Sequence, residues 1–339
     1  MNSYERLFAR LEGKPVDRVP NNCIIMGFGV RYIGACYRDF VTDYKVLTEV
    51  AIRCHEDFKL DILSAISDPM REAEGFGSEV TFPEDGVPFA RKPLLEKLSD
   101  IGNLKVSDPG SRQRMNDRLL AVRMLDEYSK GECAVQGWVE SGFAEACDLR
   151  GISNMMMDLM TEPEAIAELL EICTQQAITF ALAQVKAGAD IIAIGDAAAS
   201  LIGPVMYEKF ALPYEKKIVE AIHGAGAKAK LHICGNINKL LDKVMETGSD
   251  IIDCDWMVDF KSANEIFGNR ASACGNFDPV AILLEGKPMD VVAAVKGCLA
   301  VSSPTSIIAA GCEVPPYTKI ENLKAIAEVL GMGIGMEGR

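Results

Sequence analysis

The strongest constraint on this fold is a repeated alternation between short apolar runs and longer segments with helical periodicity. The short runs are rich in aliphatic residues and are bounded by Gly, Asp, Asn or Ser. We predict strands at Val19–Met26, Asp61–Ser64, Ala134–Gly137, Asp190–Gly195, Ala229–Cys234, Asp250–Cys254, Ala271–Gly275 and Ser306–Gly311. Strands that alternate with helices favour a parallel sheet, because each helical crossover returns the chain to the same end of the sheet.

The segments between these runs carry apolar residues at helical spacing. The expected helices are Glu162–Lys186, Tyr207–His223, Ile237–Glu246, Ala263–Phe267 and Ile320–Leu330. Thr161 followed by Glu164 is typical of a capping box at the start of the first of them. Such strand–helix units predict a closed (βα)8 TIM barrel of the α/β class, a single domain over residues 1–339. An open doubly wound sheet is the alternative, because periodicity does not distinguish the two.

Two segments lie outside this regular pattern. The charged N-terminus is expected to form a helical extension and lacks the apolar core of a signal peptide. Residues 71–116 are rich in Gly and Pro, and we interpret them as an irregular insertion or lid. No apolar stretch approaches the roughly 20 residues needed to cross a bilayer. We therefore expect a cytoplasmic protein that does not contact a membrane.

Charge and cysteine content limit the partners and the redox setting. The net charge of −14 argues against a nucleic-acid partner, since no basic cluster offsets it. The 11 cysteines include no C-x-x-C pair, so we read them as reduced thiols. Most are expected to be small buried residues. A cysteine proposed as a ligand therefore needs an argument from its position.

The positions of His232 and Cys234 support a role as metal ligands. His232 and Cys234 are two apart at the end of an apolar run, so in a strand their side chains point to the same face. Cys312 ends another run, with a glycine before it and two prolines shortly after it. Zinc accepts imidazole and thiolate ligands, and three protein ligands with a fourth position open are the catalytic pattern. Asp255 is the best candidate for a displaceable fourth ligand.

Each of these residues has a simpler explanation. His232 and Cys234 could be a hydrogen-bonded histidine beside a buried thiol, and Cys312 taken alone could be a core residue. Asp255 could cap a helix or form an ion pair at the barrel rim. The barrel nevertheless favours a shared site, because active sites of TIM barrels lie at the carboxyl ends of the strands.

Further acidic residues follow other predicted strands. Asp68 and Asp196 come after the second and fourth strands, and we take them as candidate catalytic residues. Asp148, like Glu140 and Glu145, follows the third strand and either faces the barrel mouth or is a solvated loop carboxylate.

The donor set indicates a type of chemistry. Two thiolates neutralise Zn²⁺, which makes the metal a weak generator of hydroxide but a good host for a further thiolate. A His/Cys/Cys site with one free position therefore favours alkyl transfer to or from sulfur over hydrolysis.

The chain resembles the uroporphyrinogen decarboxylase-like superfamily over nearly its whole length. The resembling segments are Leu11–Pro20, Ala187–Asp190, Leu212–Tyr214, Gly275–Pro279 and Glu321–Ala325. This resemblance implies a (βα)8 barrel. Within the superfamily the chain is similar to the zinc methyltransferase branch, whose H-x-C and distant C signature falls on His232, Cys234 and Cys312. The acidic position that can complete the zinc sphere falls on Asp255.

The resemblance implies a corrinoid-linked activity. We expect a zinc-dependent enzyme that moves a methyl group between a corrinoid, either free cobalamin or a corrinoid protein, and a small molecule. The small molecule would be a thiol acceptor or a methyl donor such as an aryl methyl ether or a methylamine. Asp68 and Asp196 would orient the substrate or the corrinoid. Arg31 and Asp148 are our candidate cofactor-binding residues.

Two other functions are weighed against this one. A metal-free tetrapyrrole decarboxylase fits less well, because only the second of its two N-terminal arginines is matched, at Arg31, and the first falls on Gly27. Its essential aspartate has a counterpart in Asp68, whereas its tyrosine falls on Cys147. A non-catalytic zinc- or corrinoid-binding protein would instead have a zinc sphere closed by four tight ligands.

Overall fold

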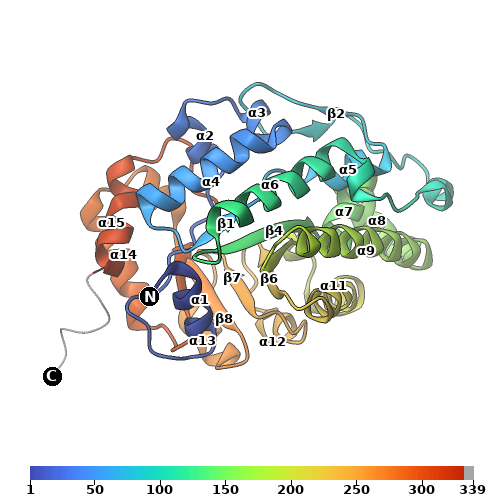
Figure 1. The fold of residues 1–339 in the computed structure, drawn as a ribbon. Helices are drawn as coiled ribbons and strands as arrows, with labels where there is room; N and C mark the ends of the chain where they lie inside the picture. Colours follow the sequence, from blue (N-terminus) through green and yellow to red (C-terminus); the bar gives the residue numbers. More distant parts are fainter. Residues whose placement is uncertain (332–339) are drawn as a thin grey trace.

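A curled sheet of parallel strands forms the centre of the molecule in the computed structural model, which describes residues 1–331 (Figure 1). In spatial order its strands are β1 (Ile62–Ser64), β4 (Ala134–Glu140), β5 (Ile191–Gly195), β6 (Lys228–Ile233), β7 (Ile251–Cys254), β8 (Ser272–Phe277) and β9 (Ile307–Ala310). Almost every strand residue is buried, because one face of the sheet lines the barrel and the other is covered by helices. The predicted barrel class and seven of its strands are confirmed.

The eighth position of the barrel is filled by irregular chain. Ile308 donates from its backbone N to the Pro20 carbonyl at 3.1 Å, and the Asn21 carbonyl accepts from the backbone N of Asp61 at 2.9 Å. Residues 19–26 thus lie between β9 and β1 and close the barrel, and we call them the closing segment. The predicted strand Val19–Met26 is wrong, since only an isolated bridge joins Asn21 to Ile308. Pro20 has no N–H to donate, and the Asn21 N–H goes to the Asp61 carboxylate instead of a strand.

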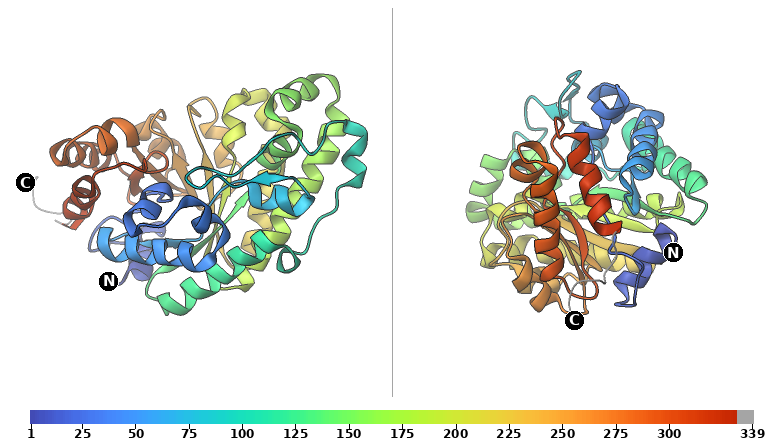
Figure 2. Two further views of the ribbon diagram at one scale, coloured as in Figure 1. Left: turned by 90° about the horizontal axis from the view of Figure 1, so that it is seen from above. Right: turned by 90° about the vertical axis from the view of Figure 1, so that its left-hand side faces the viewer.

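Helices surround the sheet on its outer face (Figure 1). They are α1 (Ser3–Leu11), α2 (Gly27–Ile33), α3 (Tyr37–Thr42), α4 (Tyr44–Phe58), α5 (Met70–Phe76), α6 (Gln113–Ser129), α7 (Gly142–Arg150), α8 (Ile152–Thr161), α9 (Pro163–Lys186), α10 (Pro204–Phe210), α11 (Leu212–Gly224), α12 (Leu241–Met245), α13 (Phe260–Phe267), α14 (Pro288–Ala300) and α15 (Ile320–Gly331). Helix α15 packs against α14 and α4 (Figure 2).

Three local predictions about helices are corrected. The helix expected at Tyr207–His223 is broken into α10 and α11, because Pro213 belongs in the first turn of a new helix. The helix expected at Ile237–Glu246 shortens to α12. Thr161 does not cap α9; its hydroxyl donates to the Met157 carbonyl within α8. The start of α9 is set by Pro163 and has no side-chain cap.

The irregular insertion is shorter than the predicted range, residues 71–116. Its ends belong to α5 and α6, and only the chain between them is irregular. That chain holds a short hairpin, β2 (Val80–Thr81) with β3 (Phe89–Ala90), and two short 3₁₀ helices, Leu98–Asn103 and Pro109–Ser111.

Helix α9 confirms the predicted helix Glu162–Lys186 and starts one residue later, but it is more apolar than the sequence analysis allowed. Among the described residues it is the one helix long and apolar enough to cross a membrane. Half of the most apolar 18-residue stretch of α9 is buried, and the helix packs against α7, α11 and β4 (Figure 1). Packing against the barrel therefore accounts for the apolar composition of α9.

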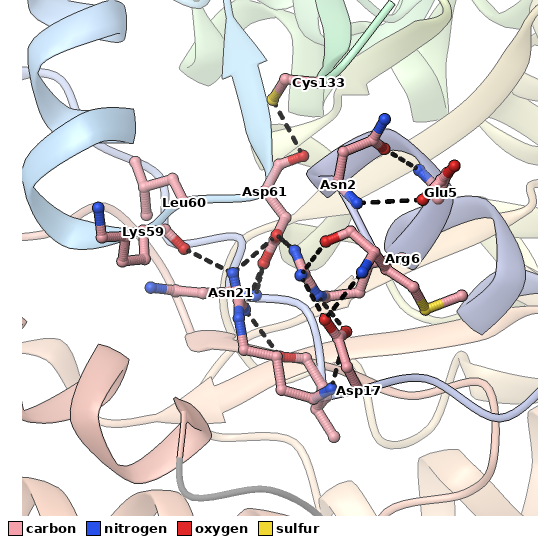
Figure 3. A network of polar contacts seen from close by, with 12 residues as sticks. Asn2, Glu5, Arg6, Asp17, Asn21, Lys59, Leu60, Asp61 and Cys133 are labelled. Atoms are coloured by element: carbon pink, nitrogen blue, oxygen red, sulfur yellow. Dashed lines mark hydrogen bonds and ion pairs between the residues drawn. The ribbon is translucent and has the colours of Figure 1, made fainter.

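A buried ionic network holds the amino end of the barrel together (Figure 3). The fully buried Asp61 carboxylate accepts from Arg6 Nη1 at 2.8 Å, from Arg18 Nη1 at 2.7 Å and from the Asn21 backbone N at 2.8 Å. Arg6 also donates to Asp17 at 2.6 Å. One carboxylate thereby joins α1, the closing segment and β1.

Candidate active site

Three potential metal donors meet at the carboxyl end of the barrel. His232 is on β6, Cys234 follows that strand directly, and Cys312 follows β9. His232 Nε2 lies 3.1 Å from Cys234 Sγ, and Cys234 Sγ lies 3.9 Å from Cys312 Sγ. All three donor atoms lie within 4.8 Å of one another. The structure thus brings together residues that are far apart in the sequence.

Gly311 is needed for the approach of Cys312. A Cβ atom at this position would lie 2.2 Å from the backbone N of Trp256, in the loop after β7. Any larger residue would push the two loops apart. The glycine before Cys312 therefore lets its loop pack against the loop that follows β7.

The donor set fits a zinc ion. Zinc–sulfur bonds of about 2.3 Å and zinc–nitrogen bonds of about 2.0 Å place tetrahedral donors roughly 3.5–3.8 Å apart. The observed separations of 3.1 and 3.9 Å bracket that range. One imidazole and two thiols make three protein ligands, which is the number that leaves a position for a substrate.

A second layer of charged groups orients the histidine. Asp253 Oδ2 lies 3.0 Å from His232 Nδ1, and Asp253 Oδ1 lies 3.0 Å from Lys230 Nζ. A carboxylate at Nδ1 accepts a hydrogen bond from the Nδ1–H, which keeps the ring proton on Nδ1 and leaves the Nε2 lone pair free to bind a metal. Sequence analysis missed both Lys230 and Asp253. Their signal is the presence of charged residues inside otherwise apolar, buried strands.

The ionisation of the three donors is coupled. The pKa of Cys312 falls to about 4, because Cys234 and His232 hydrogen-bond its thiolate and outweigh the effect of burial. The pKa of Cys234 rises well above its usual value, since it shares its proton with Cys312 and is buried. Burial lowers the pKa of His232, but Asp253 and Cys312 raise it to about 9. The site therefore carries a thiolate before any metal binds.

A cavity of about 230 Å³ opens beside the three donors. Apolar side chains form much of its wall, namely Ile24, Met26, Ile66 and Trp138. The polar part of the wall comes from Asp68, Arg71, Glu140 and Glu313. A larger cavity of about 680 Å³, around Arg10 and Lys296, shares no residue with it. The smaller cavity is the one that a reacting molecule would occupy.

Asp68 lies in the cavity wall as the sequence suggested. Its carboxylate binds Arg114 and accepts from the Met70 backbone N at 3.1 Å. Although burial raises the pKa of Asp68, Arg114 holds it below its usual value. Asp68 is thus an ionised, fixed group.

Arg71 is a functional candidate that the sequence analysis missed. For Glu140 it left open a place at the barrel mouth or in solvent, and the structure places Glu140 in the cavity wall. Arg71 Nη2 donates to Glu140 Oε1 at 3.1 Å, and Arg71 Nε donates to Glu72 at 3.2 Å. Burial raises the pKa of Glu140 to about 8, although Arg71 opposes the rise. Glu140 is therefore largely protonated at neutral pH.

The other candidates do not line this cavity. Asp196 is fully buried behind the wall, and burial raises its pKa to about 6. Asp148 is on α7, where burial and the nearby Glu72 raise its pKa to about 7. Arg31 stacks on the Tyr317 ring at 4.0 Å and borders a second cavity, which meets the first at Glu313. Their roles stay predictions.

Asp255 is near the three donors but is not one of them. Its Oδ1 accepts from the Met257 backbone N at 3.0 Å, and its negative charge contributes to the raised pKa of Cys234. The turn that it caps follows β7. Its place as fourth ligand stays a prediction.

A parallel barrel with soft metal donors and a cavity at the carboxyl ends of its strands defines a TIM-barrel enzyme with a candidate metal centre. Residues 2–331 match the uroporphyrinogen decarboxylase (URO-D) family, and the chain belongs to that family.

Individual relatives within this family are methyltransferases and decarboxylases. The chain is 34% identical over 334 residues to the methylcobamide:CoM methyltransferase MtbA of Methanosarcina mazei, covering 96% of each chain. It is 28% identical to MtaA of Methanosarcina barkeri, with 95% coverage of each. A uroporphyrinogen decarboxylase from Trichlorobacter lovleyi is 26% identical over 80% of this chain and 81% of its own.

A solved structure agrees with this result. A methyltransferase from Methanosarcina mazei superposes with a TM-score of 0.90 and 26% identity, covering 98% of this chain and 99% of the other. The chain is a methyltransferase of the URO-D family.

Proposed function

We propose that this protein is a zinc-dependent methyltransferase that moves a methyl group from a methylated corrinoid to a small thiol. The observation that carries the proposal is the convergence of His232, Cys234 and Cys312 beside the cavity. The names of the relatives support a corrinoid donor and a thiol acceptor such as CoM.

The three donor side chains would hold the zinc. When bound, zinc supplies positive charge that lowers the pKa of a substrate thiol and keeps the thiolate in place. Transfer then requires the carbon–cobalt bond to break, with its electron pair left on the corrinoid, and a sulfur–carbon bond to form. The thiol must lose its proton before this step.

The chain's own residues prepare the site for that reaction. Asp253 fixes the His232 ring, and Cys312 is ionised before substrate arrives. Ile24, Met26, Ile66 and Trp138 give the cavity an apolar wall, and charge interactions are stronger beside such a wall than in bulk water. Arg71 and Asp68 offer fixed charges at the polar side of the wall.

Metal content and turnover test the proposal together. We expect about one zinc per chain in protein purified without added metal. His232→Ala and Cys312→Ser should lose the zinc and at least about 100-fold of the methyl transfer from methylcobalamin to CoM. Absorbance reports the loss of methylcobalamin, and metal analysis reports the zinc.

Cys36→Ser is the matched control, because Cys36 is a partly exposed thiol outside the cavity wall. It should keep both zinc and turnover. Full turnover by metal-free protein would contradict the proposal. Release of CO₂ from uroporphyrinogen without metal would favour a decarboxylase instead.

A further inference from the structure

The sheet places a buried lysine directly behind the metal donors. Lys230 and His232 are two apart on β6, so they face the same side, and the register pairs His232 with Asp253 on β7. The side chain of Lys230 is fully buried, and the Asp253 side chain is 6% exposed. Asp253 therefore lies between an ammonium group and an imidazole, with one carboxylate oxygen 3.0 Å from each.

Stability alone is a poor reason for this pair. Removing two charges from water costs free energy that their attraction offsets only in good geometry, and apolar replacements of such pairs are often neutral or stabilising. The surroundings of Lys230 include the buried thiols Cys23 and Cys274, whose pKa values it lowers in part. A long aliphatic residue would fit that setting.

We propose that Lys230 is a positioning residue of the metal centre, which holds the Asp253 carboxylate so that His232 presents Nε2 to the metal. This inference rests on the proposed function, because it requires a metal at His232, Cys234 and Cys312. Lys230 touches neither metal nor substrate. It acts by fixing one carboxylate oxygen, so that the other stays aligned with His232 Nδ1.

Charge balance fits this role. Two thiolates, a neutral imidazole and Zn²⁺ sum to zero, and Asp253 with Lys230 also sum to zero. The orienting carboxylate can therefore stay ionised in the barrel without adding net charge to the centre.

The chain offers a matched control at the other end of the same strands. Asp250 lies 2.8 Å from Lys228 Nζ and 2.7 Å from His223 Nε2, so it makes the same Lys–Asp–His arrangement. Lys228 is also on β6, two residues before Lys230. This group is partly exposed and lies away from the metal donors.

The test is a double-mutant cycle on zinc affinity, measured by competition with a chromogenic chelator. Lys230→Met and Asp253→Asn should each weaken zinc binding by about tenfold or more. The double variant should lose no more than Asp253→Asn alone, because Lys230 acts only through Asp253. Lys228→Met and Asp250→Asn should leave zinc affinity unchanged.

A second readout separates positioning from folding. In cobalt-substituted protein the visible bands report the ligand geometry, and Lys230→Met should shift them whereas Lys228→Met should not. Urea unfolding of the metal-free proteins should show that Lys230→Met is folded. Unchanged zinc affinity and cobalt spectrum in folded Lys230→Met would overturn the inference. A wild-type protein that binds no zinc would instead overturn the proposed function.

Discussion

At the scale of single residues, Glu140 is a titratable group whose ionisation changes the charge of the cavity. It borders the cavity, and burial raises its pKa to about 8. Above that pH it adds a negative charge that also raises the pKa of Cys234. A negative charge here would disfavour an incoming thiolate.

Glu140→Gln imitates the protonated form and should behave like the wild type at pH 6.5–7. Above about pH 8 the wild type acquires the charge and the variant does not. The ratio of kcat/KM, variant over wild type, should then rise by about fivefold, equivalent to about 1 kcal/mol. Steady-state rates across pH measure this ratio, and a constant ratio would exclude a role for Glu140 ionisation.

Residue identity predicted the three donors but not their supporting groups. His232, Cys234 and Cys312 are found because the first two share a strand face, all three end apolar runs, and the H-x-C and distant C signature falls on them. Lys230 and Asp253 are not, because a charged residue within a short strand is also compatible with an exposed edge. Only the register of β6 with β7 shows that these two charges meet.

At the scale of elements, the closure of the barrel depends on Asp61. Its carboxylate joins two arginines and the backbone of the closing segment. Asp61→Ala leaves these donors unpaired, and we expect a loss of about 3–5 kcal/mol in the free energy of unfolding. Urea denaturation measures it.

Asp17→Ala is the control for Asp61→Ala. Asp17 also binds Arg6, but its side chain is 43% exposed, so we expect a loss below about 1 kcal/mol. Folded Asp61→Ala should still bind zinc, because the network lies at the amino end of the barrel. Equal losses of unfolding free energy in the two variants would show that burial does not strengthen the contribution of Asp61 to stability.

The same closing segment explains where element prediction failed. Strands with uninterrupted apolar runs, such as β5 and β9, could be predicted because burial on both faces demands them. Residues 19–26 looked similar but contain Pro20 and two asparagines, whose backbone is satisfied by Asp61 and Ile308. The break before α11 follows the same rule, since Pro213 cannot continue a helix.

At the scale of the whole molecule, a group of buried carboxyl groups makes stability depend on pH. Burial raises the pKa values of Glu145 and Glu215 well above the usual range, and that of Asp196 to about 6. The native state keeps protons that the unfolded chain loses above about pH 4.5. Stability should therefore fall as pH rises from about 5 to about 8. Asp68, whose pKa is lowered, has the opposite effect only at more acidic pH.

Glu215→Gln tests this dependence, because it removes one such group while keeping its shape. Each group that stays protonated in the native state costs about 1.4 kcal/mol per pH unit in this window. The variant should equal the wild type near pH 4 and become increasingly more stable than the wild type as the pH rises toward 8. Urea unfolding with a chelator present measures this difference without the contribution of metal binding.

Glu220→Gln is the control, because it changes an exposed residue on the same helix. It should leave the pH dependence of stability the same as in the wild type. A parallel pH dependence in Glu215→Gln and the wild type would mean that Glu215 is ionised in the folded barrel.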